Sequence, residues 1–270
     1  MRMINVVLMS LLVSIPASAG VVFDVVATDT RSSKTFDTEV LVEGDNLKMA
    51  IAPGTREGRN GEMIYQGAQR SMILVNHEEK TFMTIDEEAI KAITSQLGQA
   101  MSQMEHALKD VPEEQRAMVE KMMKGKLPTA TPKRQASELR STGERATHNG
   151  YPCVKYEVLR GGTKLRELWV TDWSNIEGGK EVVASFEQMA EFFKELLDSI
   201  PNVGDQAAFA EPTWEHMKEL GGFPVVTRDF AADGTLGNEA ELRSARRQKI
   251  EPGAFEAPAG YARREMFSTR

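Results

Sequence analysis

The fold is decided by the stretch MIYQGAQRSMILVNHEEKTFMTI, which occupies residues 63–85. Apolar and β-branched residues fill three short runs in it, separated by a Gln-Gly turn at 66–67 and a polar tip at 76–79. This spacing predicts a three-strand meander over 63–65, 72–75 and 81–85. Three strands of this length are not stable alone, so the chain must supply further strands or a covering helix.

Alternating apolar residues predict more strands on both sides of the meander. Turn-forming residues separate these strands, among them Glu-Gly-Asp-Asn at 43–46 and Arg-Gly-Gly at 160–162. With the meander they make about ten strands, and the additional ones are expected at 21–27, 38–43, 47–52, 137–147, 153–159, 164–171, 223–230 and within 236–250.

Helical periodicity appears in separate blocks of the chain. An apolar stripe at steps of three and four follows the meander, and a second helix begins at Pro112 and ends near Gly125. We expect these two to form a helical hairpin, an insert at about 86–125, that lies on the sheet. Further helices are expected at 181–200 and 212–220. Strands in hairpins and helices in blocks predict the α+β class with an antiparallel sheet.

The first nineteen residues have the form of a secretory signal peptide. Arg2 precedes an apolar run at 4–15, and Ala17-Ser18-Ala19 is a small-x-small cleavage site. The run is about a dozen residues, whereas a membrane span needs about twenty. We therefore predict cleavage after Ala19, a periplasmic protein without a transmembrane segment, and a single domain over 20–270. No later run approaches the length of a span.

Charge and cysteine content narrow the function further. Loss of Arg2 with the leader leaves 32 basic and 40 acidic residues, a net charge of −8, which argues against nucleic acid as a partner. Cys153 is the one cysteine, so an internal disulfide is impossible. The favoured interpretation is a packed, unpaired thiol.

Five motifs together resemble a known family. They are Gly-Asp-Asn-Leu-Lys-Met at 44–49, Ile-Tyr-Gln-Gly at 64–67, His-Glu-Glu-Lys-Thr-Phe at 77–82, Gly-Tyr-Pro-Cys-Val-Lys-Tyr at 150–156 and Trp-Val-Thr-Asp-Trp at 169–173. The chain resembles an exported bacterial domain-of-unknown-function family that is similar in pattern to the Lol-type lipoprotein carriers. That resemblance implies a curved antiparallel half-barrel whose concave side is plugged by helices and encloses an apolar cavity. In the carriers the cavity holds acyl chains, and the family brings no catalytic residues.

Local motifs for catalysis are lacking. The sequence has no Gly-x-Ser-x-Gly elbow and no His-Glu-x-x-His pair, and its four histidines fall in different predicted elements. His77 with two glutamates is interpreted as a polar turn, and the arginines at 243, 246 and 247 as a solvated strand face. We predict a protein that is not an enzyme and has no cofactor.

Methionine is the compositional oddity, because twelve methionines remain after removal of the leader. Three interpretations stay open: plain core, an adaptable lining for a hydrophobic ligand, and soft thioether ligands for Cu(I) at Met101, Met104, Met118 and Met122. Met72 and Leu74 lie on one face of the central strand, with Ile73 and Val75 on the other. The sequence favours a periplasmic protein that binds a hydrophobic, lipid-like molecule, with a metal-binding protein or a structural partner protein as alternatives. The candidate cavity residues are Met72, Leu74, Met101, Met104, Phe186, Met189 and Phe193.

Overall fold

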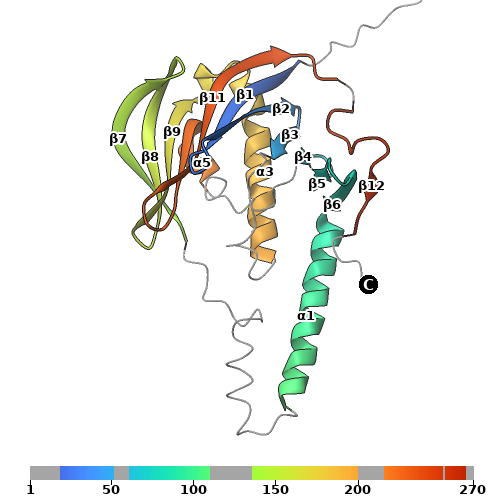
Figure 1. Cartoon of the computed structure of the whole chain (residues 1–270). Helices are drawn as coiled ribbons and strands as arrows, with labels where there is room; N and C mark the ends of the chain where they lie inside the picture. Colours follow the sequence, from blue (N-terminus) through green and yellow to red (C-terminus); the bar gives the residue numbers. More distant parts are fainter. Residues whose placement is uncertain (1–18, 52–60, 110–135, 200–215, 252, 266–270) are drawn as a thin grey trace, which may run out of the picture.

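The computed structural model describes residues 19–51, 61–109, 136–199, 216–251 and 253–265. In this part of the chain, twelve strands form one open, curved sheet in the order β12-β6-β5-β4-β3-β2-β1-β11-β10-β9-β8-β7 (Figure 1). Neighbouring strands are antiparallel except β12 and β6, which are parallel. The predicted α+β class with a curved antiparallel sheet is confirmed.

The first strand joins the two halves of the sheet, because β1 pairs with β2 on one side and with β11 on the other. One half contains the predicted meander as β4, β5 and β6. The bounds of the strands on this side are β1 (Gly20–Asp29), β2 (Lys34–Glu43), β3 (Asn46–Ile51), β4 (Gly61–Gln66), β5 (Ser71–Asn76) and β6 (Thr81–Ile85).

The other half contains the later strands. Its β8–β9 turn has the predicted glycines, and Gly161 and Gly162 both adopt positive φ, as the favoured two-residue hairpin turn requires. The bounds are β7 (Glu138–His148), β8 (Tyr151–Arg160), β9 (Thr163–Asp172), β10 (Gly222–Phe230) and β11 (Leu236–Gln248), and β12 (Ala262–Arg263) follows at the far edge beside β6.

Helix α3 (Gly179–Ser199) packs against the inner, concave face of the sheet. Its buried side chains recur at steps of three and four, which places them on one stripe. Rings from the sheet and from the short helix η1 (Trp173–Asn175) meet this stripe, and the ring centroids of Phe23 and Phe186 are 5.7 Å apart. The stripe consists of Val182, Phe186, Met189, Phe193 and Leu196, and it completes the main hydrophobic core.

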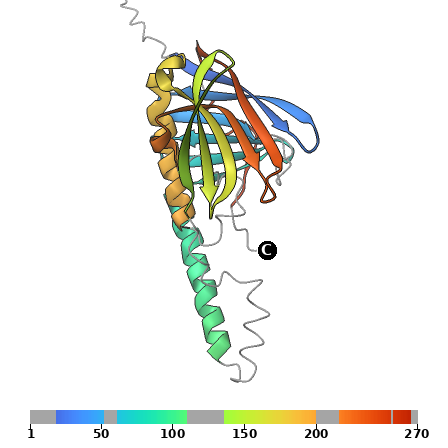
Figure 2. The same ribbon diagram turned by 90° about the vertical axis from the view of Figure 1, so that its left-hand side faces the viewer.

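Helix α1 (Glu87–Lys109) leaves the sheet instead of lying along it. Figure 2 shows α3 and α1 along one side of the sheet, with α1 running on beyond it. Only Asp86 separates β6 from α1, and its carboxylate accepts a hydrogen bond from the Ala89 amide at 2.8 Å. This short junction leaves no loop to turn the helix back across the sheet. The expected partner helix at 112–125 lies outside the described residues.

The predicted helix at 212–220 appears in its last turn as α5 (Met217–Leu220), and residues 212–215 lie outside the described part. Gly221 ends it in the left-handed conformation that a helix C-terminus favours. Among the described helices, none has both the length and the apolar character needed to cross a membrane.

The C-terminal segment covers the opposite, convex face of the meander. Ile64, Ile73 and Val75 form a small core there with Phe82, and the segment adds Phe255, Ala257 and Tyr261. The Tyr261 hydroxyl lies 2.9 Å from His77 Nδ1, and the Ala262 amide donates to the Lys80 carbonyl. The C-terminal segment at 255–261 therefore occupies the second apolar face of the central strand.

Candidate ligand-binding surface

Two adjacent rows of side chains cross the inner face of β2 to β6. On each strand the two rows are two residues apart, so the side chains of both rows point to the same side of the sheet. The first, which we call the buried row, consists of Val42, Leu47, Tyr65, Met72 and Ile85. The second, which we call the methionine row, consists of Val40, Met49, Met63, Leu74 and Met83.

The two rows differ in their exposure. Every member of the buried row is at most 2% exposed, because α3 packs over it, and Phe192 of α3 lies 5.6 Å from Tyr65 between ring centroids. Burial raises the pKa of the Tyr65 phenol above its ordinary value. In the methionine row, by contrast, Met49, Leu74 and Met83 are only half-buried.

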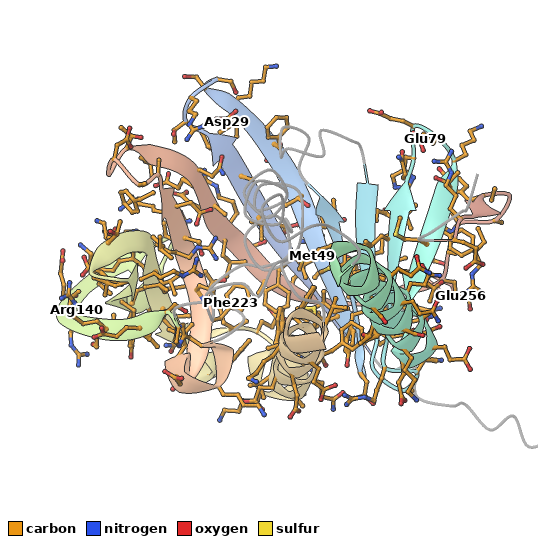
Figure 3. The ribbon with its side chains drawn as sticks, turned by 90° about the horizontal axis from the view of Figure 1, so that it is seen from below. Asp29, Met49, Glu79, Arg140, Phe223 and Glu256 are labelled. Atoms are coloured by element: carbon orange, nitrogen blue, oxygen red, sulfur yellow. The ribbon has the colours of Figure 1, made fainter. Side chains whose placement is uncertain are left out.

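Neighbouring elements flank the methionine row: Val40 pairs with the fully buried Phe23 of β1, and Val25 lies two residues further along that strand. Val25 of β1 and Ile90 of α1 are partly buried and pack against the same core as Met49 and Leu74. Figure 3, seen from below, places Met49 on the sheet face toward α3 and α1. The described residues thus include three partly exposed side chains on this face, Met49, Leu74 and Met83, beside the buried Val40 and Met63 of the same row.

The predicted cavity residues separate into three groups. Met72, Phe186, Met189 and Phe193 are brought together, but all are packed in the main core. Leu74 is half-buried in the methionine row. The side chains of Met101 and Met104 lie outside the described part of the chain, as do residues 118 and 122, so the copper interpretation stays a prediction.

Sequence reasoning missed Met49, Met63 and Met83 as candidate lining. Each lies two residues from a member of the buried row on its own strand, and strict alternation therefore placed it on the inner face. The sequence therefore indicated which face these methionines occupy. It could not indicate how exposed their side chains are, because that depends on how far α3 reaches across the sheet.

The β7–β11 half of the sheet contains a network of charged side chains, whereas the β2–β6 half contains the methionine row. Glu167 accepts hydrogen bonds from Trp169 Nε1 at 3.2 Å and from Arg228 at 3.0 Å, and it lies 3.3 Å from Lys155 Nζ. Burial alone would raise the pKa of Glu167, but the hydrogen bonds from Arg228 and Lys155 outweigh it and hold the pKa below its usual range. Arg228 also pairs with Glu239 at 2.5 Å.

The charges in this network balance. Lys155 pairs with Glu144 at 3.1 Å as well as with Glu167, and Lys164 lies 3.7 Å from Glu167. Three cations therefore face the three carboxylates of Glu144, Glu167 and Glu239. Such a network fixes the strands relative to one another, and it does not offer a net charge to an ionic ligand.

The other polar features seen in the sequence have structural partners. Cys153 is buried in the main core, which raises its thiol pKa, as expected for a packed thiol. Arg246 pairs with Asp24 and Glu39, and Arg247 with Glu181. Among the described residues, no three His, Cys, Asp or Glu side chains are grouped as a metal site needs.

One histidine connects two elements. Buried His216 lies 3.0 Å from Ser137 Oγ through Nε2 and 3.3 Å from Glu219 through Nδ1. Ser137 immediately precedes β7, and Glu219 lies on α5. The chain of polar contacts therefore ties the start of β7 to this short helix.

Comparison with known proteins does not assign a family. No family model and no curated protein matches the chain. An uncharacterized conserved protein from Thermus thermophilus is similar in structure, with a TM-score of 0.44, 8% identity, and coverage of 92% of this chain and 91% of that chain. PNGF-II matches with a TM-score of 0.39 and 8% identity, over 92% of this chain and 31% of that chain.

A MucB chain, from the complex of Pseudomonas aeruginosa MucA and MucB, matches with a TM-score of 0.35 and 10% identity. The match covers 90% of this chain and 57% of that chain. At these identities and TM-scores, the three likenesses carry no conclusion about the ligand or activity of this chain.

Proposed function

We propose that the protein is a non-enzymatic binding or carrier protein of the periplasm, and that it binds an apolar, lipid-like molecule along the methionine row. The observation that carries the proposal is the partial exposure of Met49, Leu74 and Met83 beside a row that α3 buries completely. Covering such a surface is favourable by about 25 cal/mol per Å² of apolar area removed from water.

Methionine suits this role because its side chain is unbranched and polarizable. It can repack around ligands of different shape, whereas the branched residues of the buried row fix one packing. Met49 and Met63 are direct cross-strand partners, and Leu74 lies between Met63 and Met83. A ligand lying across the strands would contact these side chains in succession.

The leader supports the periplasmic location. The predicted cleavage point after Ala19 directly precedes β1, which begins at Gly20. A Cβ at position 20 would lie 2.4 Å from Ile250 Cδ1 and 2.7 Å from the Val42 carbonyl oxygen, so the mature chain would begin at a position where only glycine fits. Ala19 itself is exposed, as a cleavage site must be.

Two measurements test the proposal. Organic extraction of protein purified from the envelope, followed by mass spectrometry, should identify a co-purified apolar molecule. Titration of the delipidated protein with N-phenyl-1-naphthylamine should give saturable fluorescence enhancement. Empty extracts together with no enhancement would contradict the proposal.

Neighbouring residues of β5 supply a matched pair of variants for the titration. Leu74→Ala should raise the Kd of the fluorophore about 3- to 10-fold, because it removes apolar contact on the inner face. Ile73→Ala, on the face that the C-terminal segment covers, should lower stability and leave the Kd unchanged. Equal Kd values for the two variants would show that the fluorophore does not bind on the methionine row.

A further inference from the structure

Two buried polar atoms face the inner side of the sheet without a hydrogen-bonding partner among the described residues. They are Thr38 Oγ1 on β2 and His148 Nε2 at the end of β7. More than nine in ten buried polar groups in proteins are paired, and an unpaired one is destabilising. Two such atoms beside an apolar surface therefore require an explanation.

Thr38 lies next to the methionine row. It pairs across the strands with Val25, and it is two residues from Val40, so its side chain shares the inner face with both. Val25 packs against the main core, and Val40 belongs to it. The hydroxyl is thus a polar atom at the border of an apolar surface.

His148 approaches the same border from the other half of the sheet. It pairs with Tyr151 and shares a face with Ala146, and both of these residues pack against the main core. Its ring lies 4.6 Å from the Trp169 ring between centroids. The imidazole is therefore on the core side of the β7–β8 hairpin.

A hydrogen bond brings this hairpin to the middle of the sheet. Asn149, the residue after His148, donates from Nδ2 to the Leu242 carbonyl at 2.8 Å. Leu242 pairs with Val25, and Val25 pairs with Thr38. Because strands lie about 4.8 Å apart, the backbones at Leu242 and Thr38 are separated by about 10 Å. The turn after His148 and the strand that carries Thr38 therefore lie on opposite sides of the pair of Leu242 and Val25.

We propose that Thr38 and His148 form a polar subsite that hydrogen-bonds the head of an amphipathic ligand whose apolar body lies on the methionine row. The inference rests on the proposed function and adds a ligand class to it: a lipid-like molecule with an uncharged hydroxyl or carbonyl group. An uncharged head fits because cations of the neighbouring strands are already paired with carboxylates: Lys155 and Arg228 with the glutamates of the charged network, and Arg246 with Asp24 and Glu39.

The test compares two probes of nearly equal size in displacing N-phenyl-1-naphthylamine. Dodecan-1-ol carries a hydroxyl group, whereas 1-chlorododecane has a chlorine atom in its place and cannot donate a hydrogen bond. The wild-type protein should bind the alcohol about 3- to 10-fold more tightly than the chloride, the range expected for one or two net hydrogen bonds. Thr38→Val, which keeps the shape of the side chain, should reduce this preference, and Thr38→Ser should keep it.

His148→Phe keeps a ring beside Trp169 and removes both ring nitrogens, so it should also reduce the preference for the alcohol. The double variant Thr38→Val/His148→Phe should bind both probes alike. Without ligand, Thr38→Val should raise the Tm, because it removes an unpaired buried hydroxyl. This rise also shows that the variant folds.

Equal binding of alcohol and chloride by the wild-type protein would overturn the inference, as would an unchanged preference in a folded Thr38→Val variant. Either result leaves the apolar binding of the proposed function in place. Failure of the fluorophore and of both probes to bind removes the proposed function and the subsite together. The two failures are therefore distinguishable.

Discussion

The two halves of the sheet hold their strands together in different ways. In the β2–β6 half, the inner face carries two apolar rows, and α3 covers only one of them completely. In the β7–β11 half, Glu167 connects Lys155, Trp169 and Arg228 from three strands by directed hydrogen bonds and ion pairs. One continuous sheet therefore combines an adaptable side with a fixed side.

This difference indicates where a ligand can be accommodated. Apolar contacts are non-directional, so methionine side chains can rearrange around a guest at little cost. A network of ion pairs around a buried carboxylate such as Glu167 loses stability when a partner moves away from it. We therefore place variable binding on the β2–β6 half and assign the β7–β11 half to holding the sheet in shape.

The largest expected effect separates the two rows of the adaptable half. Leu47→Ala should lower the free energy of unfolding by about 3 kcal/mol, because Leu47 is fully buried and its loss leaves a cavity. Met49→Ala, two residues along the same strand, should lower it by about 1 kcal/mol, since Met49 is already half-exposed. Urea unfolding measures the free energy of unfolding of each variant. An equal decrease in the two variants would contradict the distinction between the rows.

The next effect concerns the fixed half. Glu167→Gln should lower the free energy of unfolding by about 1–2 kcal/mol near pH 7, less than the loss of a fully buried pair, because Arg228 and Lys155 keep other carboxylate partners. The folded-state pKa of Glu167 is below its ordinary value, so its ionised form contributes stability above the unfolded pKa, about 4.3.

That contribution is lost as the pH falls below this value, so the wild type and Glu167→Gln should converge in stability in acid. The control is Glu87→Gln, which breaks an exposed pair with Lys91 and should leave stability nearly unchanged. A difference between wild type and Glu167→Gln that persists undiminished into acid would show that the network does not depend on this charge.

The smallest effect concerns the C-terminal segment on the convex face. Tyr261→Phe should lower the free energy of unfolding by about 0.5–1 kcal/mol, because it removes the hydrogen bond to His77 and keeps the ring packed. The double variant with His77→Phe should cost less than the sum of the two single changes. Full additivity in urea unfolding would mean that the two side chains are not coupled.

Local patterns in the sequence were enough to predict most elements. The meander, the Gly161-Gly162 turn and the stripe of α3 depend on residues within a few positions of one another, and all three appear as expected. The two apolar faces of β5 were also predicted from alternation. What covers the second face was not predicted, because the C-terminal segment around Phe255 lies about 180 residues further along the chain than Ile73.

The candidate site was less predictable for a physical reason. A packed core and a ligand surface both require apolar residues at the same spacing, so Met72 and Leu74 could not be distinguished by pattern. Their difference depends on the reach of α3 over the sheet. The polar pair Thr38 and His148 could not be predicted from the sequence either. Its placement depends on the contact between Asn149 and Leu242, which spans three strands of the sheet.

Methionine methyl NMR tests the central claim most directly. With the methyl groups of methionine labelled with ¹³C, dodecan-1-ol should shift the Met49 and Met83 signals of the methionine row and leave those of Met72 and Met189, sealed in the core, nearly unmoved. Methionine-to-leucine variants assign each signal. Saturable shifts confined to Met49, Met83 and their neighbour Met63 are the predicted result. No shift at these three, or shifts only elsewhere in the chain, would contradict the account.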